Sequence, residues 1–466
     1  MYKKHLQFSI EDFYFPYGKL SPENRWVKIA DVIDWDVIED DYARKFVNNG
    51  APAHPARMAL GSLIAKQMLG CSDEELTLQI AENPYLQFLI GLKSFEESCP
   101  FGASTLVAFR KRFSEDDIMR INESIIKGGK DDDESDDEGN GEAGTLILDA
   151  TVAPSDITYP QDIKLLNAAR EKLEAMIGML CAQTGAQKPR MYKKTARKDF
   201  LNWSKTKRRS AKSTRRGLRK QLNYVRRDLG YVEELLEVHN AELDDRQTEL
   251  LHTISCVYEQ QSYMFENKCH SVPKRIVSIC QPWVRPIVRG KTNANTEFGA
   301  KMHISIADGF ARLEDLSFEA FNEADFLISA AETHKERTGE YPTRILADKI
   351  YRNRKNLAWC KERGIAISGP RLGRPPKDKT LTRMEKIQEY QDVCDRNEVE
   401  GAFGTMKCAY GIDPVKARLE ETTKTVIALA VLAFNLKKRL KVSLAFILEW
   451  LYRTILANED RVVIAA

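Results

Sequence analysis

Carboxylates and cations that could do chemistry are concentrated in residues 396–407, which read RNEVEGAFGTMK. Glu400 follows Arg396 by four residues and precedes Lys407 by seven, so in a helix all three share one face. Glu398 is turned by about 200° from Glu400, at roughly 100° per residue, and lies off that face. A glutamate flanked by cations is either an exposed ion-paired residue or one ligand of a metal site that other acids complete. This stretch alone leaves both interpretations open.

Two apolar runs elsewhere in the chain end in aspartate. TLILDA (145–150) and TRILAD (343–348) are predicted to be buried strands that end at Asp149 and Asp348. A single acid at a strand end is more often a helix cap or a turn former. In parallel α/β sheets, however, sites form at the carboxyl ends of strands, so two such aspartates can converge. With Glu400 they would make a carboxylate cage for Mg²⁺, and two such ions can promote attack on a phosphodiester.

Positive charge is concentrated in one segment. Between Lys188 and Arg227 there are 17 lysines and arginines, and Asp199 is the only acid. This density predicts a polyanionic partner, and we expect nucleic acid; the alternative is an acidic protein partner, including the acidic linker of this chain. Interleaved aromatic residues could add stacking contacts. The cations of this segment that we expect to contact DNA are Lys207, Arg208, Arg209, Arg215 and Arg216.

A second basic loop, GPRLGRPPKDK (369–379), follows the TRILAD unit. Its Arg371 and Arg374 resemble the arginines that some proteins insert into the minor groove of DNA. Loops rich in proline, glycine and arginine are common, so this motif on its own is a weak signal.

The elements that must position these groups fall into an α/β pattern with added helices. Residues 1–127 are predicted to form a helical amino-terminal domain, in which STLVAFRKRFSEDD (104–117) could present a basic helix of a helix-turn-helix module. An ordinary helical bundle explains these residues equally well. Residues 128–144 are rich in acidic residues and glycine, which predicts a disordered linker.

After this linker, strands predicted near residues 145–150 and 275–348 make one catalytic domain, 145–420. A helical, basic insertion of about 163–270 interrupts it, where a heptad pattern of leucines and valines predicts a helical hairpin or a small antiparallel coiled coil. Residues 421–466 are expected to be carboxy-terminal helices with a packing role.

Composition favours a protein of the cytoplasm. The nine cysteines are scattered without a C-x-x-C pair, which favours reduced thiols over a disulfide framework or a zinc site. The first residues lack the apolar core of a signal peptide, and the most apolar run, 425–434, is too short to span a bilayer. We therefore expect no membrane partner and a cytoplasmic, nucleoid-associated protein of a prokaryote.

Three blocks of the sequence resemble one known family. LILDAT, ILADKIYRNRKN and RNEVEGAFGTMK are similar to the three catalytic blocks of bacterial insertion-sequence DDE transposases, in the group whose glutamate block reads Y-x2-R-x3-E-x6-K. Arg396, Glu400 and Lys407 fit that block, but its tyrosine position holds Val393, and Tyr390 lies one turn earlier. The segment PARMALGSLIAKQMLGCSDEELTLQIAENPYLQFLIGL also resembles the helical domain that precedes the catalytic domain in such enzymes.

The resemblance implies an RNase H-like catalytic domain of the α/β class with a large helical insertion, preceded by an all-α domain. In that fold the first and fourth strands lie side by side and the acidic helix packs across them. It implies Asp149, Asp348 and Glu400 as the catalytic metal ligands, holding two Mg²⁺ or Mn²⁺ ions. The cations expected to orient the glutamate or to contact DNA phosphate are Arg396, Lys407, Lys349 and Arg352.

The resemblance also implies an activity and its partners. The enzyme would bind the terminal inverted repeats of a transposon as double-stranded DNA, cleave them by two-metal hydrolysis and transfer the strands to target DNA, acting as a homodimer on DNA. Two alternatives remain: a DNA-binding protein whose nuclease site has decayed or been repurposed, and a metal-dependent nuclease without strand transfer.

Overall fold

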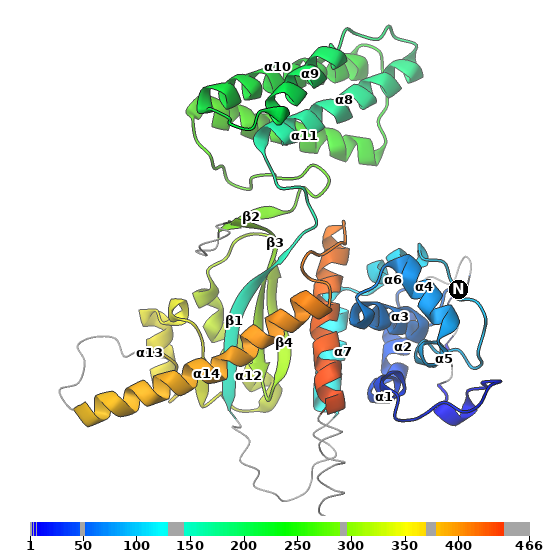
Figure 1. Ribbon diagram of the computed structural model, residues 1–466, viewed down its shortest axis with the longest axis vertical. Helices are drawn as coiled ribbons and strands as arrows, with labels where there is room; N and C mark the ends of the chain where they lie inside the picture. The colour runs from blue at the N-terminus through cyan, green and yellow to red at the C-terminus, as the bar shows by residue number, and fades with distance from the viewer. Residues whose placement is uncertain are drawn as a thin grey trace, which may run out of the picture. The chain divides into compact units, whose positions relative to one another are not determined.

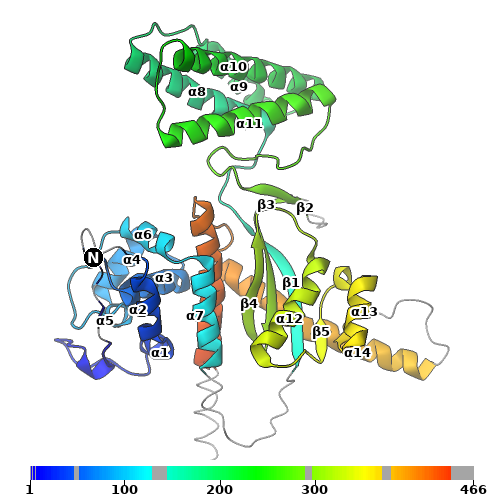
Figure 2. The same ribbon diagram turned by 180° about the vertical axis from the view of Figure 1, so that it is seen from behind.

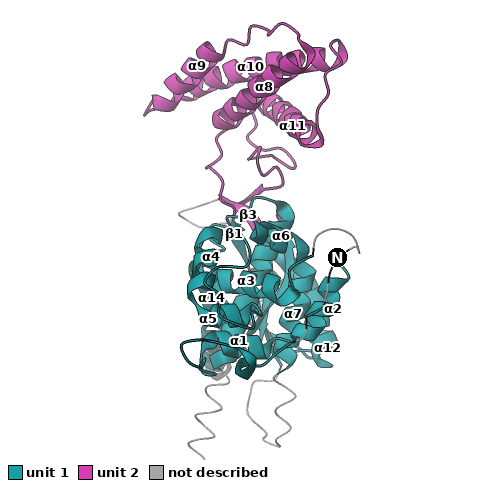
Figure 3. Ribbon diagram, turned by 90° about the vertical axis from the view of Figure 1, so that its right-hand side faces the viewer, with its two compact units in different colours: residues 1–154, 301–317, 321–466 teal, residues 155–300, 318–320 magenta. Residues whose placement is uncertain are grey.

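The computed structural model describes residues 2, 4–5, 7–46, 52–128, 144–288, 296–369 and 379–441, without the side chains of 379–382. Predictions for Arg371, Arg374, nearly all of the linker 128–144 and the residues after 441 lie outside the described residues. The chain divides into two compact units, which are described separately (Figure 3). Unit 1 contains residues 1–154, 301–317 and 321–466, and unit 2 contains residues 155–300 and 318–320. The domain boundaries expected from the sequence stay predictions.

Short helices make up the amino-terminal part of unit 1. Their apolar side chains form one core, in which most residues of α3 are buried. Side chains cap several helix starts: Ser72 accepts a hydrogen bond from the backbone N–H of Glu75, and Ser114 accepts one from that of Asp117. The elements are η1 (Ile10–Asp12), α1 (Arg25–Val32), α2 (Trp35–Ala43), α3 (Ala56–Leu69), α4 (Asp73–Glu82), α5 (Pro84–Leu89), α6 (Thr105–Arg112) and α7 (Glu115–Lys127).

A mixed sheet follows in the chain. β1 pairs in parallel with β5, β5 pairs in parallel with β6, and β3 pairs antiparallel with β4. The strand order is β2-β3-β1-β5-β6, with β4 on β3; the short β2 pairs only with the first residues of β3, within unit 2. The strands are β1 (Thr145–Pro154), β2 (Arg285–Val288), β3 (Thr296–Ala307), β4 (Phe310–Ser317), β5 (Arg344–Leu346) and β6 (Ala366–Ile367).

The first strand is longer than the sequence pattern predicts. The prediction that it ends at Asp149 is wrong, because β1 continues to Pro154. Thr151, Val152 and Ala153, which follow the acid, are all buried, and β-branched residues suit a strand. Asp149 therefore lies in the middle of a strand, whereas Asp348 comes two residues after the last residue of the short β5, at the start of η3 (Lys349–Tyr351).

Helices cover both faces of this sheet. Leu148 and Ile345 pack in a core with α12 (Leu327–Thr338) and a residue of α13 (Arg354–Glu362). The 3-10 turn η2 (Glu323–Phe326) precedes α12. The long helix α14 (Lys379–Ala409) contacts β1 and β5. Figure 1 shows α14 in front of β1, and Figure 2, seen from behind, shows α12 on the opposite side.

A helix over residues 420–441 joins the amino-terminal core to the sheet. Leu429 and Leu432 belong to the same core as the amino-terminal helices. The side chain of Asn435, which is fully buried, donates to the carbonyl of Ala311 in β4 (2.7 Å) and accepts from its N–H (2.9 Å). It also donates to Asn122 of α7 (2.7 Å). The sequence indicated a packing role for this helix. In the structure, it packs through these contacts on the amino-terminal core, on β4 and on α7.

Unit 2 is built around four helices: α8 (Asp162–Thr184), α9 (Lys193–Lys205), α10 (Ala211–Glu237) and α11 (Asp245–Asn267). The heptad positions of α10, including Leu222, Val225 and Val232, are buried in a core with residues of α8 and α11. Among the residues that the structure describes, no helix is long and apolar enough to cross a membrane.

Burial of Glu115, at the start of α7, makes stability depend on pH. Burial, with help from Asp116 and Asp315, raises the pKa of the Glu115 carboxyl from 4.5 to about 7, although Lys424 opposes the shift. Because Glu115 binds its proton more tightly in the folded state, protonation adds to the free energy of unfolding. This contribution is complete below pH 4.5 and is lost as the pH rises through about 7.

We therefore expect Glu115→Gln, which cannot ionise, to melt at a higher temperature than the wild type at pH 8, and the difference to disappear by about pH 4. Thermal unfolding followed by circular dichroism measures this. Substitution of the exposed Glu82 by glutamine is the control and should change the melting temperature little at either pH. A difference for Glu115→Gln that is the same at both pH values would contradict the assignment.

Candidate active site

The two predicted aspartates lie close together where β5 ends beside β1. Ile147 of β1 is paired with Leu346 of β5, and each aspartate lies two residues further along its own segment. Neighbouring strands are about 4.8 Å apart, and side chains alternate between faces, so both acids continue the row on the α14 side of the sheet. Ile147 and Leu346 line a pocket with residues of α14, which identifies that face.

Burial dominates the electrostatics of Asp149. Its side chain is only 17% exposed. Burial raises the pKa of this carboxyl to about 6, and the charges of Glu323 and Asp348 add to the rise. The backbone N–H of Ala150, which donates to Oδ1 (2.8 Å), and the guanidinium of Arg396 oppose it. An acid in this environment would gain strongly from a bound cation.

Asp348 also has the ordinary role of a helix cap. Its Oδ1 accepts a hydrogen bond from the N–H of Lys349 (2.6 Å) at the start of η3. The side chain is nevertheless exposed. A cap through one oxygen leaves the other oxygen available to a ligand.

Helix α14 brings Arg396 and Glu400 to this edge. The Nη1 atom of Arg396 lies 3.6 Å from Oδ2 of Asp149, and its Nη2 lies 3.3 Å from Oε1 of Glu400. The Glu400 side chain is 58% exposed. Glu398 does not face Asp149, because it pairs with Lys438 of the following helix (3.6 Å). Lys407 is half-buried. The face shared by Arg396 and Glu400 is thus the one that meets Asp149.

The residues present fit a divalent cation in part. Carboxylate oxygens are the ligands that Mg²⁺ prefers, and Asp149 of β1 and Asp348, just after the neighbouring β5, offer them. Within the described part of the chain, however, no three acids, histidines or cysteines are grouped closely enough to hold one ion. The carboxylate of Glu400 is paired with Arg396, so it would have to leave that arginine to join the aspartates.

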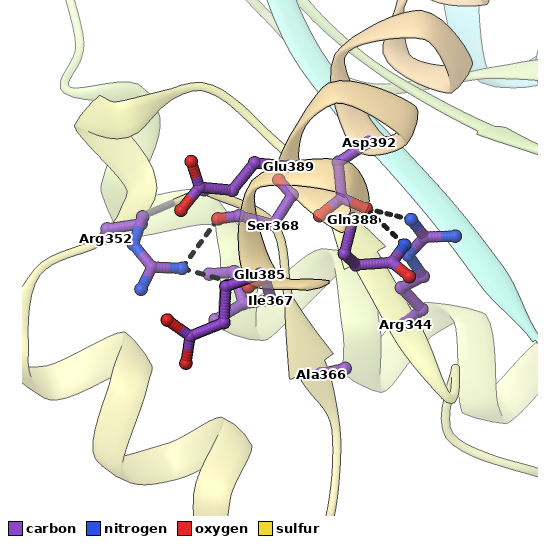
Figure 4. A pocket seen from close by; sticks show the side chains of 10 residues that line it. Arg344, Arg352, Ala366, Ile367, Ser368, Glu385, Gln388, Glu389 and Asp392 are labelled. Carbon is purple, nitrogen blue, oxygen red and sulfur yellow. Dashed lines mark hydrogen bonds and ion pairs between the residues drawn. The ribbon is translucent and has the colours of Figure 1, made fainter. Parts of the chain in front are cut away.

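Arg352, expected to contact DNA, is tied to the protein backbone. Its Nη1 donates to the carbonyl oxygens of Ile367 (2.9 Å) and Ser368 (2.6 Å) (Figure 4). It lines a pocket of about 570 Å³ between β6 and α14, together with Glu385 and Glu389. Lys349, on the same turn, is exposed.

Most of the basic segment is open to solvent. Fifteen of the 17 lysines and arginines between 188 and 227 are exposed, and Arg215 and Arg227 are half-buried. Two of the aromatic residues, Trp203 and Tyr224, are less available for stacking on bases than the sequence suggested, whereas Tyr192 is exposed. Trp203 is buried under Arg209, whose guanidinium lies 4.2 Å from the ring centre, and Tyr224 donates to Asp199 (2.9 Å).

The basic helix proposed for a helix-turn-helix module uses two of its three cations in contacts within the protein, and Lys111 is exposed. In α6, Arg110 makes two hydrogen bonds to Asp73, and Arg112 bonds the hydroxyl of Tyr42 and stacks on Phe46. These contacts favour the ordinary helical bundle over a DNA-reading helix at this position.

Three residues near the aspartates were not singled out from the sequence. Glu323, which pairs with Lys301 (2.9 Å), acts on the pKa of Asp149. Tyr351 and His303 are buried and in contact with each other, 2.9 Å apart. Only Tyr351 carried a signal, because it lies three residues after Asp348 in the same block.

Two segments of the chain match known transposase domains. Residues 345–437 match the model of the transposase DDE domain, and residues 16–112 match that of a transposase domain (DUF772). The chain is also similar to the uncharacterized protein ORF8 in the nfe locus of Rhizobium meliloti, with 29% identity over 158 residues that cover 33% of this chain and 73% of that protein. No solved structure matches.

A transposase DDE domain match that includes β6 and α14, together with a transposase domain match in the amino-terminal helices, identifies an enzyme that acts as a transposase. Together, the two matches and this relative support an insertion-sequence DDE transposase. This family implies an RNase H-like fold, dependence on divalent metal ions and DNA as the partner.

Proposed function

We propose that this transposase binds the terminal inverted repeats of its element, hydrolyses phosphodiester bonds there and joins the freed 3′-OH to target DNA. The observation that carries the proposal is the parallel pairing of β1 with β5, which brings Asp149 of β1 and Asp348, just after β5, together next to Arg396 and Glu400. Because two transposon ends must be held together for strand transfer, the proposed assembly on DNA is a homodimer.

In this proposal Asp149, Asp348 and Glu400 hold two Mg²⁺ or Mn²⁺ ions. Such ions supply activation of the attacking oxygen and stabilisation of the leaving oxygen. The residues of the chain prepare the site: Arg396 balances the buried charge of Asp149 and keeps Glu400 paired in the absence of a ligand. Once Glu400 leaves it, Arg396 is free to bind a DNA phosphate, for which a guanidinium is well suited.

Asp149→Asn tests the catalytic assignment. Asparagine keeps the shape of the side chain and carries no buried charge, so the fold and DNA binding should persist. Cleavage of terminal inverted-repeat DNA with Mg²⁺ or Mn²⁺ should fall more than about a hundredfold, because removal of a ligand costs at least as much as removal of its supporting contacts. Glu398→Gln, on the same helix but off the shared face, is the control and should cleave normally. Cleavage by Asp149→Asn at the wild-type rate would refute the assignment.

Strand transfer separates a transposase reaction from that of a nuclease. With precut ends that carry a free 3′-OH and a supercoiled target plasmid, we expect joined products that depend on Asp348 as well as on Asp149. Sequencing of the junctions measures this. Cleavage of uncut ends without any joining of precut ends would favour a nuclease without strand transfer, and binding without either reaction would favour a DNA-binding protein with a decayed site.

The exposed basic segment of α9 and α10 is proposed to contact DNA phosphates. We expect affinity for DNA to fall steeply with salt, with a log–log slope of about −0.9 for each neutralised phosphate. Substitution of Lys207, Arg208 and Arg209 together by glutamine should make that slope shallower by up to about 2.7. Fluorescence anisotropy over a range of salt concentrations measures the slope.

A matched triple variant in unit 2 controls for the loss of three charges. Arg246, Lys268 and Lys274 are exposed and lie outside the basic segment. Their substitution by glutamine should leave the slope almost unchanged. Equal effects of the two triple variants would remove the basic segment from the DNA interface.

A further inference from the structure

Asp348 follows a very short strand. β5, which precedes it, has three residues, and the chain leaves the sheet after Leu346. The position of the acid is therefore set by the turn that follows, which contains η3 and ends near Arg352. Placement matters in such a site, because a displacement of about 1 Å can cost on the order of a hundredfold in rate.

Side chains fasten this turn at both ends. At its start, Ser368 donates to the carbonyl of Ala347 (3.0 Å) and accepts from its N–H (2.9 Å). At its end, Arg352 donates to the carbonyls of Ile367 and Ser368, where β6 ends. Arg352 also lies against Gly369: a Cβ added to this glycine would be only 3.1 Å from Arg352 Cδ. Asn356, almost fully buried, donates to the carbonyl of Tyr351 (2.9 Å).

Near the end of the turn, the side chain of Tyr351 contacts a residue of β3. The ring of Tyr351 is fully buried, and its Oη lies 2.9 Å from Nε2 of His303. His303 is on β3, which lies on the other side of β1 from β5, so the contact joins the segments on either side of the strand that carries Asp149. The charges that act on the Tyr351 hydroxyl are those of Glu323, Asp149, Asp348 and Arg396, so the candidate site lies within electrostatic reach of it.

Neither partner of this contact is a charged catalytic group at neutral pH. Burial raises the pKa of Tyr351, so its hydroxyl keeps its proton. Burial also lowers the pKa of His303 to about 4, so the imidazole is neutral, and within the described residues its Nδ1 has no hydrogen-bond partner. The pair is therefore suited to fixing geometry and not to proton transfer.

We propose that Tyr351 is a positioning residue of the reaction, which acts through its contact with His303 to hold Asp348 beside Asp149. The proposal rests on the assignment of these two aspartates under the proposed function. It assigns a role within the reaction to a buried pair that touches neither DNA nor an ion.

Tyr351→Phe tests this proposal, since it removes the hydroxyl and keeps the buried ring. We expect kcat for cleavage of inverted-repeat DNA to fall about tenfold to a hundredfold, with KM for DNA unchanged, as for other groups that support metal ligands. Binding of Mn²⁺ to the protein without DNA, followed by the electron paramagnetic resonance signal of free Mn²⁺, should weaken by a similar factor. His303→Leu should have the same effects, and the double variant should be no worse than either single variant.

Two further variants separate positioning from simple destabilisation. Tyr42→Phe removes another buried tyrosine hydroxyl, which bonds Arg112 in the amino-terminal core, and should leave kcat and Mn²⁺ binding unchanged at a comparable melting temperature. His303→Gln, whose side chain amide can still reach a hydroxyl, should recover part of the activity lost in His303→Leu.

Wild-type kcat and Mn²⁺ binding in Tyr351→Phe would overturn the proposal, as would losses that Tyr42→Phe shares. The result is separable from the proposed function. If Asp149→Asn is inactive while Tyr351→Phe is normal, only the positioning role fails. If Asp149→Asn cleaves DNA normally, the catalytic assignment itself fails.

Discussion

The parallel pairing of β1 with β5 is the constraint on which the candidate catalytic centre depends. These strands come from segments far apart in the chain, with unit 2 inserted between them, and three paired residues set their register. That register brings Asp149 and Asp348 to the same row on one face of the sheet, where α14 adds Arg396 and Glu400. A slip by one residue would turn every side chain of β1 to the other face and remove Asp149 from the site.

In the candidate site, burial disfavours the charged form of Asp149, and neighbouring groups offset this cost to different extents. Asp149 has a raised pKa, and Arg396 offers the nearest opposite charge. The same arginine is paired with Glu400. The Glu400 carboxylate can therefore either stay paired with Arg396 or bind a metal ion, but not both at once. Asp348 is less enclosed but depends on a turn that polar contacts fasten from several sides. Stability and catalytic geometry are thus coupled in the few residues after β5.

The sequence predicted the parts of this site that follow from local pattern. Apolar runs ending in acids predicted β5 and the start of β1, and helical spacing separated Glu400 from Glu398, which pairs with Lys438. The sequence could not show that β1 continues past Asp149, because the burial of the residues after it is decided by packing. Nor could it show that Arg352 donates to backbone carbonyls, since the sequence does not indicate which partners an arginine side chain has in the fold. The contact of Tyr351 with His303 joins distant segments and leaves no periodic signal.

Metal binding between the paired aspartates is the central claim, and anomalous diffraction from Mn²⁺ tests it most directly. Crystals of the Asp149→Asn and wild-type proteins with inverted-repeat DNA would be soaked in Mn²⁺ and measured at the manganese absorption edge. The account predicts a strong anomalous peak within about 2.5 Å of carboxylate oxygens of Asp149 and Asp348 in the wild type, with Glu400 turned toward it, and a weakened or absent peak in the variant. A wild-type complex that cleaves its DNA with Mn²⁺ bound elsewhere, and none at these aspartates, would contradict the account.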